Sequence, residues 1–177
     1  KLDASDYTWK TLPREVADEW VEECLASLTI DYGNTVLNSS ARNNYMIRRM
    51  ARILKRTVWA LGEQIRKGMF TPENYEISFS GVSDLESIHI ELSPEEQLKL
   101  RGRIDRVDTC EDAEHVYVKV IDYKSGTTSF QLLALYHGLQ LQLVIYLNAA
   151  MELMKKEHPD KEVLPAGVLY YQIQDPV

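Results

Sequence analysis

The spacing of apolar residues predicts two helices within the first seventy positions of the chain. After Pro13, apolar residues recur four positions apart, as they do on one face of an amphipathic helix: Val16, Trp20, Cys24 and Leu28. A second helix is expected to begin after the capping signal Asn38-Ser39-Ser40 and to end at Gly68. Residues 1–70 are therefore predicted to form a helical part.

From Pro72 onward, the pattern changes to short runs of β-branched and aromatic residues separated by Gly, Ser, Pro, Asp and Glu. These runs predict strands over 75–79, 88–92, 98–107 and 115–121, in an antiparallel meander. The polar connection 108–114 is short, which is typical of a hairpin. Such a hairpin would bring Asp105 and Asp122 close together.

The residue pattern in the last third of the chain predicts a crossover helix between two strands. Residues 130–156 contain no proline and carry leucines at helical spacing, so one long helix is expected there, followed by a strand over 163–173. Together these elements indicate an α/β sandwich around a mixed sheet. At 177 residues, the chain is expected to form a single domain, with a helical part over 1–70 and a core over 72–177.

Composition narrows the classes of protein that need consideration. The hydrophobic fraction of 45% and the absence of a long apolar run are typical of a soluble protein without a membrane partner. The two cysteines form no CxxC pair, which favours the reducing cytoplasm. Because the chain begins at Lys1, without methionine or a signal peptide, we expect it to be part of a longer protein.

The charge is unevenly distributed along the chain. The net charge of −7 argues against binding of nucleic acid by bulk electrostatics, yet residues 42–67 hold eight basic residues and one acidic residue. Arg52 and Arg56 in this segment are candidates for a surface that flanks DNA. An ordinary solvated helix face is the alternative interpretation.

Two charged residues interrupt an apolar strand face near position 122. Asp122 and Lys124 share one face because side chains alternate along a strand, and that face also carries Val116, Val118 and Val120. A charge at the end of a buried face requires a partner or a metal ion. The alternative is an exposed ion pair that contributes less than about 1 kcal/mol.

These residues suit hydrolysis of a phosphodiester. Mg²⁺ retains several waters and takes few protein oxygens, so Asp105, Asp122 and the backbone carbonyl of Tyr123 are a plausible ligand set. The metal would activate water and offset charge in the transition state. Lys124 would orient the attacking water or offset charge on the phosphate. Glu76, at the start of a predicted strand, is a further candidate carboxylate.

Three motifs occur in order along the chain: Gly102-Arg103-Ile104-Asp105, then Asp122-Tyr123-Lys124-Ser125-Gly126, then Gln142 and Tyr146 in Q-x-x-x-Y spacing. Together they resemble the RecB-type branch of the PD-(D/E)xK nucleases. The stretches GRIDRVD, IDYKSG, GLQLQLVIYL and PAGVLYYQIQDP further resemble the C-terminal nuclease domain of the AddB/RexB family of helicase-nuclease subunits.

The resemblance implies a restriction-endonuclease-like sandwich and a Mg²⁺-dependent DNA exonuclease, with Mn²⁺ as an alternative ion. It further implies that Asp105 and Asp122 bind metal, that Lys124 is the catalytic lysine, and that Gln142 and Tyr146 position the DNA strand. The implied partners are DNA and an AddA-like helicase-nuclease subunit, in recombinational repair of double-strand breaks. A catalytically silent module that binds DNA or a partner is the competing hypothesis.

The chain departs from the family pattern in two respects. Cys24 and Cys110 do not stand in the cysteine pattern of an iron-sulphur nuclease, so no cluster is expected. No histidine precedes His89, although an upstream histidine normally completes the RecB-type metal site. We therefore expect this chain by itself to bind metal weakly and to cleave poorly or not at all.

Overall fold

The structure, a computed structural model, describes residues 1–31, 40–79, 89–93 and 96–175. It divides into two compact units. The first comprises Lys1–Met69 with Ile173–Val177, and the second comprises Phe70–Gln172. Among the described helices, none has the length and apolar composition needed to cross a bilayer.

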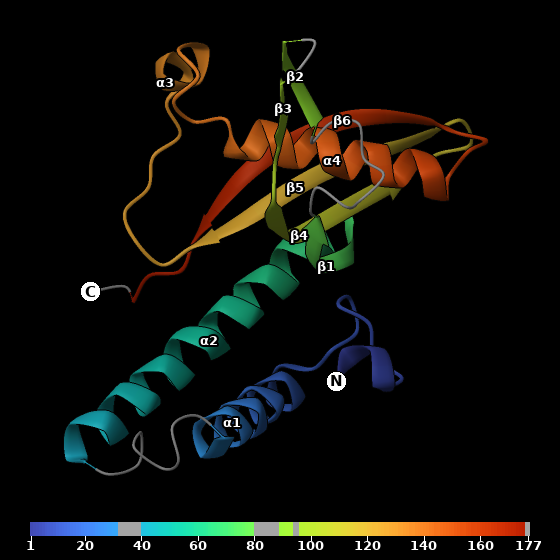
Figure 1. Cartoon of the computed structure of the whole chain (residues 1–177). Helices are drawn as coiled ribbons and strands as arrows, with labels where there is room; N and C mark the ends of the chain where they lie inside the picture. The colour runs from blue at the N-terminus through green and yellow to red at the C-terminus, as the bar shows by residue number, and fades with distance from the viewer. Residues whose placement is uncertain (32–39, 80–88, 94–95, 176–177) are drawn as a thin grey trace. The chain divides into compact units, whose positions relative to one another are not determined.

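The first unit is helical, as its apolar spacing predicts. It contains a short 3₁₀ helix η1 (Leu2–Ala4) and two α-helices, α1 (Arg14–Asp31) and α2 (Ala41–Lys67), which pack against each other (Figure 1). The side chain of Ser40 accepts a hydrogen bond from the backbone N–H of Asn43 at 3.2 Å and so caps α2. Gly68 is the C-cap residue of α2. The predicted start and end of this helix are both confirmed.

The second unit is built on a mixed sheet of four strands. These strands are β1 (Thr71–Phe79), β4 (Gly102–Glu111), β5 (His115–Lys124) and β6 (Glu162–Gln172). Their order is β1-β4-β5-β6; β1 and β5 are antiparallel to β4, and β6 is parallel to β5. The predicted α/β fold with an antiparallel part, a crossover and a final strand is confirmed.

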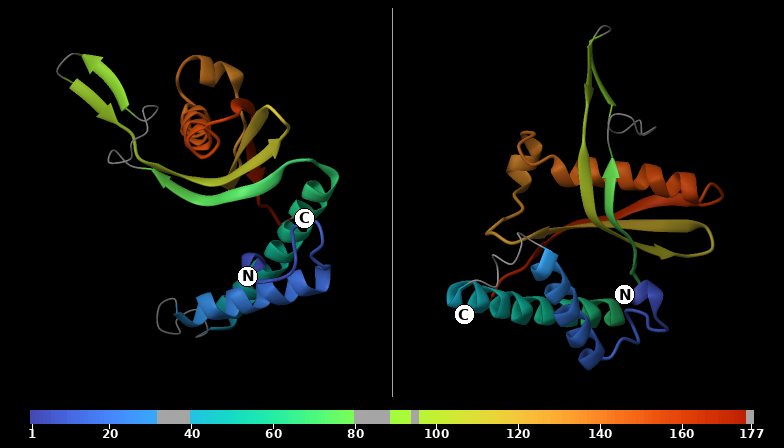
Figure 2. Two further views of the ribbon diagram at one scale, coloured as in Figure 1. Left: turned by 90° about the vertical axis from the view of Figure 1, so that its right-hand side faces the viewer. Right: turned by 60° about the horizontal axis from the view of Figure 1, so that its bottom comes forward.

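Two strands depart from the predicted meander. β2 (His89–Ser93) and β3 (Glu96–Lys99) form a two-stranded sheet of their own, which projects from the second unit (Figure 2). The predicted strand over 98–107 is interrupted between Lys99 and Gly102. The reason is topological: β1 pairs directly with β4, so the segment that connects them cannot lie between them in the main sheet. The prediction of a single meander was wrong.

The helix expected over 130–156 is two helices, α3 (Leu132–Tyr136) and α4 (Gln142–Glu157). Gly138 ends α3 with φ of +75°, a conformation that favours glycine. The backbone N–H of Leu139 bonds Ala134 O at 2.8 Å, and that of Gly138 bonds Leu135 O at 2.9 Å. This is a Schellman C-cap, which satisfies the last carbonyls of α3 and lets α4 begin in a new direction.

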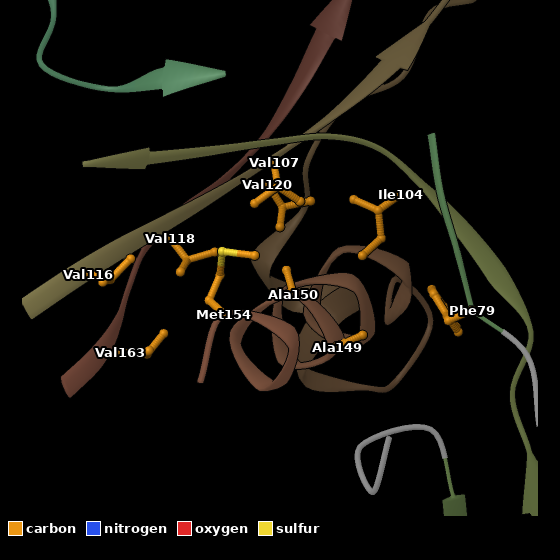
Figure 3. Packing of buried hydrophobic residues seen from close by; sticks show 10 residues of the cluster. All are labelled: Phe79, Ile104, Val107, Val116, Val118, Val120, Ala149, Ala150, Met154 and Val163. Carbon is orange, nitrogen blue, oxygen red and sulfur yellow. The ribbon is translucent and has the colours of Figure 1, made fainter. Parts of the chain in front are cut away.

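α4 packs on one face of the sheet and closes the hydrophobic core (Figure 3). Val116, Val118 and Val120 on β5 are fully buried against α4. α4 contributes the small residues Ala149 and Ala150, so its backbone can approach the sheet closely. This packing holds the N-terminal end of α4 near the C-terminal end of β5.

Candidate active site

The C-terminal end of β5 places a carboxylate and an ammonium group directly after the valine core. Asp122 follows Val120 on the face that α4 covers, and it is 3% exposed. Lys124 Nζ lies 2.6 Å from Asp122 Oδ2. A buried carboxylate needs such a partner because removing the charge from water is costly. The shared face of these two residues agrees with their predicted alternation.

α4 contributes two polar side chains to the same place. Gln142, the first residue of α4, donates from Nε2 to Asp122 Oδ1 at 3.3 Å and to the Tyr146 hydroxyl at 3.0 Å. Its Oε1 accepts from Lys124 Nζ at 3.4 Å. The i, i+4 spacing of Gln142 and Tyr146 puts both on one helix face. These contacts link the second and third sequence motifs.

Asp105 joins the site through the backbone of β5. Its Oδ2 accepts the N–H of Tyr123 at 2.8 Å. The hairpin between β4 and β5 brings this about, since Arg106 is the cross-strand partner of Ile121. The predicted proximity of Asp105 and Asp122 therefore follows from the register of the hairpin.

Gly102 of the first motif has no side chain, and this lets the Tyr146 ring of the third motif pass close to it. A Cβ at this position would lie 2.5 Å from Phe79 Cζ and 3.0 Å from Tyr146 Cε1. The rings of Phe79 and Tyr146 meet edge to face, with centroids 5.8 Å apart. The close passage of these rings over β4 requires glycine.

The carboxylates of the site favour the positively charged form of Lys124. Close contact with Asp122 raises the pKa of Lys124. Burial opposes this rise, and the charge of Asp105 adds to it. Lys124 Nζ also lies 5.5 Å from the centre of the Tyr170 ring. Lys124 is thereby held protonated beside the carboxylates.

The two carboxylates suit a divalent cation. Among the described residues, Oδ2 of Asp122 is buried without a hydrogen bond, although Lys124 Nζ lies beside it. Asp105 uses Oδ2 to accept the Tyr123 N–H, and the described residues form no hydrogen bond to its Oδ1. Two carboxylates with acceptor capacity next to a backbone carbonyl are the hard oxygen ligands that Mg²⁺ and Mn²⁺ prefer.

The remaining predicted site residues lie elsewhere. Glu76 has a φ of +52° and forms an ion pair with Arg103 at 2.9 Å, with 60% of its side chain exposed. Arg52 and Arg56 belong to the helical unit, where they line a groove between α1 and α2. Arg52 is bound by Asp175 at 2.8 Å. No contact described in the structure links Glu76 to Asp105 or Asp122.

A separate group of possible ligand atoms occurs in the second unit. Glu73, Glu157 and His158 lie close enough together to share an ion, but both glutamates are exposed, and Glu73 accepts a hydrogen bond from Thr109 at 2.5 Å. None of these three residues was predicted from the sequence to bind a metal ion. Exposed acidic residues cluster in many proteins without a metal ion, so the group adds nothing to the site at Asp122.

Arg106 and the side chain of Tyr123 were not predicted from the sequence. Arg106 Nη1 donates to the Tyr123 hydroxyl at 3.1 Å. Arg106 and Asp108 follow the G-x-x-D motif directly along the chain, and Val107 between them faces the core, so alternation directs both to the opposite face. The signal that the sequence offered for this pair was two opposite charges on the second face of a strand that is buried on both sides.

Comparison with known proteins places these observations in context. The family model described as PD-(D/E)XK nuclease superfamily matches residues 4–177. The chain is 47% identical over 172 residues to a protein of Lachnoclostridium phytofermentans that is named as a subunit of an ATP-dependent helicase/deoxyribonuclease. It is 41% identical over 169 residues to the protein of the same name from Alkaliphilus oremlandii, and 39% identical over 176 residues to that of Thermoanaerobacter sp. strain X514.

The matches cover nearly all of this chain but a small part of each relative. They span 97%, 96% and 99% of the chain in these three alignments. They span 14% of the first relative and 15% of each of the other two. The chain therefore corresponds to about one seventh of the length of these relatives.

Proposed function

The chain belongs to the PD-(D/E)XK nuclease superfamily, and on that premise we propose that it is a Mg²⁺-dependent DNA exonuclease domain of a helicase-nuclease. We propose further that residues 1–177 act as one nuclease domain in the cytoplasm, where an AddA-like subunit is the partner. The biological role that follows is recombinational repair of double-strand breaks. Relatives named as helicase/deoxyribonuclease subunits support this proposal.

The observation that carries the proposal is the convergence of three motifs on one carboxylate. Asp122 is contacted by Lys124 at 2.6 Å and by Gln142 at 3.3 Å, while Asp105 binds the adjacent peptide N–H at 2.8 Å. A surface ion pair would not explain a carboxylate that is almost fully buried. A nuclease centre explains it, because such a centre needs carboxylates and an ammonium group at one point.

Each residue then has a role that its position supports. Asp105, Asp122 and the carbonyl of Tyr123 would hold the cation, which activates water and offsets the charge of the phosphoryl group when bound. Lys124, kept protonated by its neighbours, would orient the water or stabilise charge on the phosphate oxygens. Gln142 and Tyr146 would contact the DNA strand, the first through its amide and the second through its ring.

The groove on the helical unit supports a second, weaker contact with DNA. It has a volume of about 650 Å³ and is lined by basic residues, by Trp59 and by the acidic Asp18 and Glu22. Arg56 forms no ion pair within the described part of the chain, whereas Arg52 is bound to Asp175. We propose Arg56, and Arg52 when released from Asp175, as contacts for the phosphate backbone.

Substitution at the site tests the proposal. In the helicase-nuclease that contains this chain, Asp122→Ala and Lys124→Ala should each abolish cleavage of one DNA strand and leave ATP-driven unwinding intact. Loss of a carboxylate ligand or of the lysine removes stabilisation of the transition state, so a decrease of at least about 10²-fold is expected. Strand-specific labelling of a duplex substrate measures both outcomes.

Matched controls separate this result from a general defect. Asp160→Ala and Lys155→Ala change exposed residues of the same charge, and both variants should cleave normally. Unchanged cleavage of both strands by the Asp122 and Lys124 variants would refute the assignment. A wild-type helicase-nuclease whose cleavage of both strands is lost when its other nuclease centre is inactivated, with Mg²⁺ or Mn²⁺ present, would instead favour the silent binding module.

A further inference from the structure

A charged network lies behind the candidate active site, on the face of the sheet opposite the valine core. Arg106 is 1% exposed and Asp108 is 0% exposed. Val107, between them, pairs with Val120 and faces the core, so strand alternation directs Arg106 and Asp108 to the other side. The Gly102–Asp108 stretch therefore contributes side chains to both faces of the sheet.

The network is fully paired. Arg106 binds both oxygens of Asp108, from Nε to Oδ1 at 2.5 Å and from Nη2 to Oδ2 at 2.7 Å. Lys119, directly across the hairpin from Asp108, places its Nζ 3.0 Å from Oδ2. Burial disfavours the charge of Arg106, but the hydrogen bonds to Asp108 and Tyr123 outweigh it and raise the pKa of Arg106.

One hydrogen bond connects this network to the candidate site. The remaining nitrogen of Arg106, Nη1, donates to the hydroxyl of Tyr123 at 3.1 Å. The Tyr123 ring also packs edge to face on Tyr171, with centroids 5.7 Å apart. The backbone N–H of Tyr123 is held by Asp105 at 2.8 Å. The residue between Asp122 and Lys124 is thus anchored through both its side chain and its backbone.

We propose that Arg106 is a positioning residue for the metal site, acting through the hydroxyl of Tyr123. By holding the Tyr123 side chain, it fixes the peptide whose carbonyl is the proposed ligand and whose N–H orients Asp105. This inference rests on the proposed function, because it concerns the same cation site.

Stability alone does not account for the network. A buried ion pair costs desolvation energy, and well-packed apolar residues in its place are often neutral or stabilising. A guanidinium group does what an apolar side chain cannot: it gives two donors to Asp108 and directs a third at Tyr123. The Tyr123 hydrogen bond, rather than the burial, is the feature that a positioning role requires.

The test removes the single hydroxyl that links the network to the site. Tyr123→Phe keeps the ring and its contact with Tyr171, whereas an Arg106 variant would leave Asp108 buried and poorly paired. Tyr171→Phe is the matched control, because it removes a hydroxyl from the neighbouring ring on β6 to which the described residues donate no hydrogen bond. Both variants are made in the helicase-nuclease that contains this chain.

Two measurements are required of each variant: the dependence on metal, in binding and in cleavage, and the amide hydrogen exchange of the metal-free protein. Calorimetric titration with Mn²⁺ should show roughly tenfold weaker binding for Tyr123→Phe, the usual effect of losing a group that orients a metal ligand. Cleavage should need correspondingly more metal and recover at saturating concentration. In the metal-free protein, amide hydrogen exchange at position 123 should accelerate. Tyr171→Phe should match the wild type in both measurements.

The outcomes separate this inference from the proposed function. Equal Mn²⁺ affinity in the two variants, or unchanged exchange at position 123, overturns the positioning role even when the wild type cleaves DNA normally. Cleavage that survives Asp122→Ala overturns the proposed function instead. In that case the exchange rate at position 123 still decides whether Arg106 holds the peptide.

Discussion

At the scale of single residues, the candidate site depends on a position that carries no side chain. Gly102 lies where the rings of Phe79 and Tyr146 cross β4, and Tyr146 in turn accepts a hydrogen bond from Gln142. The first motif, through Gly102, thus leaves the space that the Tyr146 ring of the third motif occupies. A residue with no chemistry of its own affects the position of residues that have it.

Gly102→Ala should therefore destabilise the second unit by about 1–3 kcal/mol, the usual cost of overpacking a core. The added Cβ would lie 2.5 Å from Phe79 and 3.0 Å from Tyr146, so both rings must move. Urea unfolding measures the loss. Gly167→Ala on β6 is the control, because a Cβ there meets nothing within 4 Å. Equal stability of the two variants would contradict this account of Gly102.

At the scale of elements, the hairpin between β4 and β5 sets the register that joins Asp105 to the Tyr123 peptide. Its turn is closed by Asp112, whose Oδ1 accepts the N–H groups of Glu114 and His115 at 2.9 and 2.7 Å. These two backbone hydrogen bonds lower the pKa of Asp112 to about 2. The turn is therefore held by an ionised carboxylate.

This makes the stability of the hairpin dependent on pH. The pKa of Asp112 is lower in the folded chain than the unfolded value of about 3.9, so its contribution is complete above that pH and disappears as the pH falls through about 2. Asp112→Ala should be less stable than the wild type at pH 7, and the difference should shrink between pH 4 and pH 2.

Urea unfolding at a series of pH values measures this difference. Asp160→Ala, which removes an exposed acidic side chain in the turn that precedes β6, serves as the control for loss of a surface carboxylate. A deficit of the Asp112 variant that stays constant from pH 7 to pH 2 would show that its ionised carboxylate does not hold the turn.

At the scale of the whole molecule, the chain combines a helical unit with a unit built on the mixed sheet. The candidate site lies entirely within the second unit, on β4, β5 and α4. A cation held there binds the folded state of that unit and not the unfolded chain. Metal should therefore stabilise the protein by mass action.

We expect Mn²⁺ at one hundred times its dissociation constant to stabilise the second unit by about 2.7 kcal/mol. Calorimetric melting measures the shift, and tryptophan fluorescence reports on the first unit, because Trp9, Trp20 and Trp59 all belong to it. Asp122→Ala should abolish the stabilisation. A shift of equal size in that variant would place the bound ion elsewhere, for example at Glu73, Glu157 and His158.

The sequence by itself determined the kinds of element, the hairpin, the fold class and the family, and the superfamily match over residues 4–177 confirms the resemblance drawn from the three motifs. These features are local: caps, turns and side-chain periodicity act over a few neighbouring residues. The positions of Asp122 and Lys124 on one face followed from strand alternation alone.

The tertiary structure decided which of several conformations compatible with the local sequence the chain adopts. The leucine spacing of 130–156 fits one helix, yet Leu132, Leu133 and Leu139 are exposed and Gly138 ends α3. The burial of Arg106, the ring contacts above Gly102 and the departure of β2 and β3 from the main sheet depend on residues far apart in the chain. Local preference is worth about 1 kcal/mol or less per residue, so packing between distant elements overrides it.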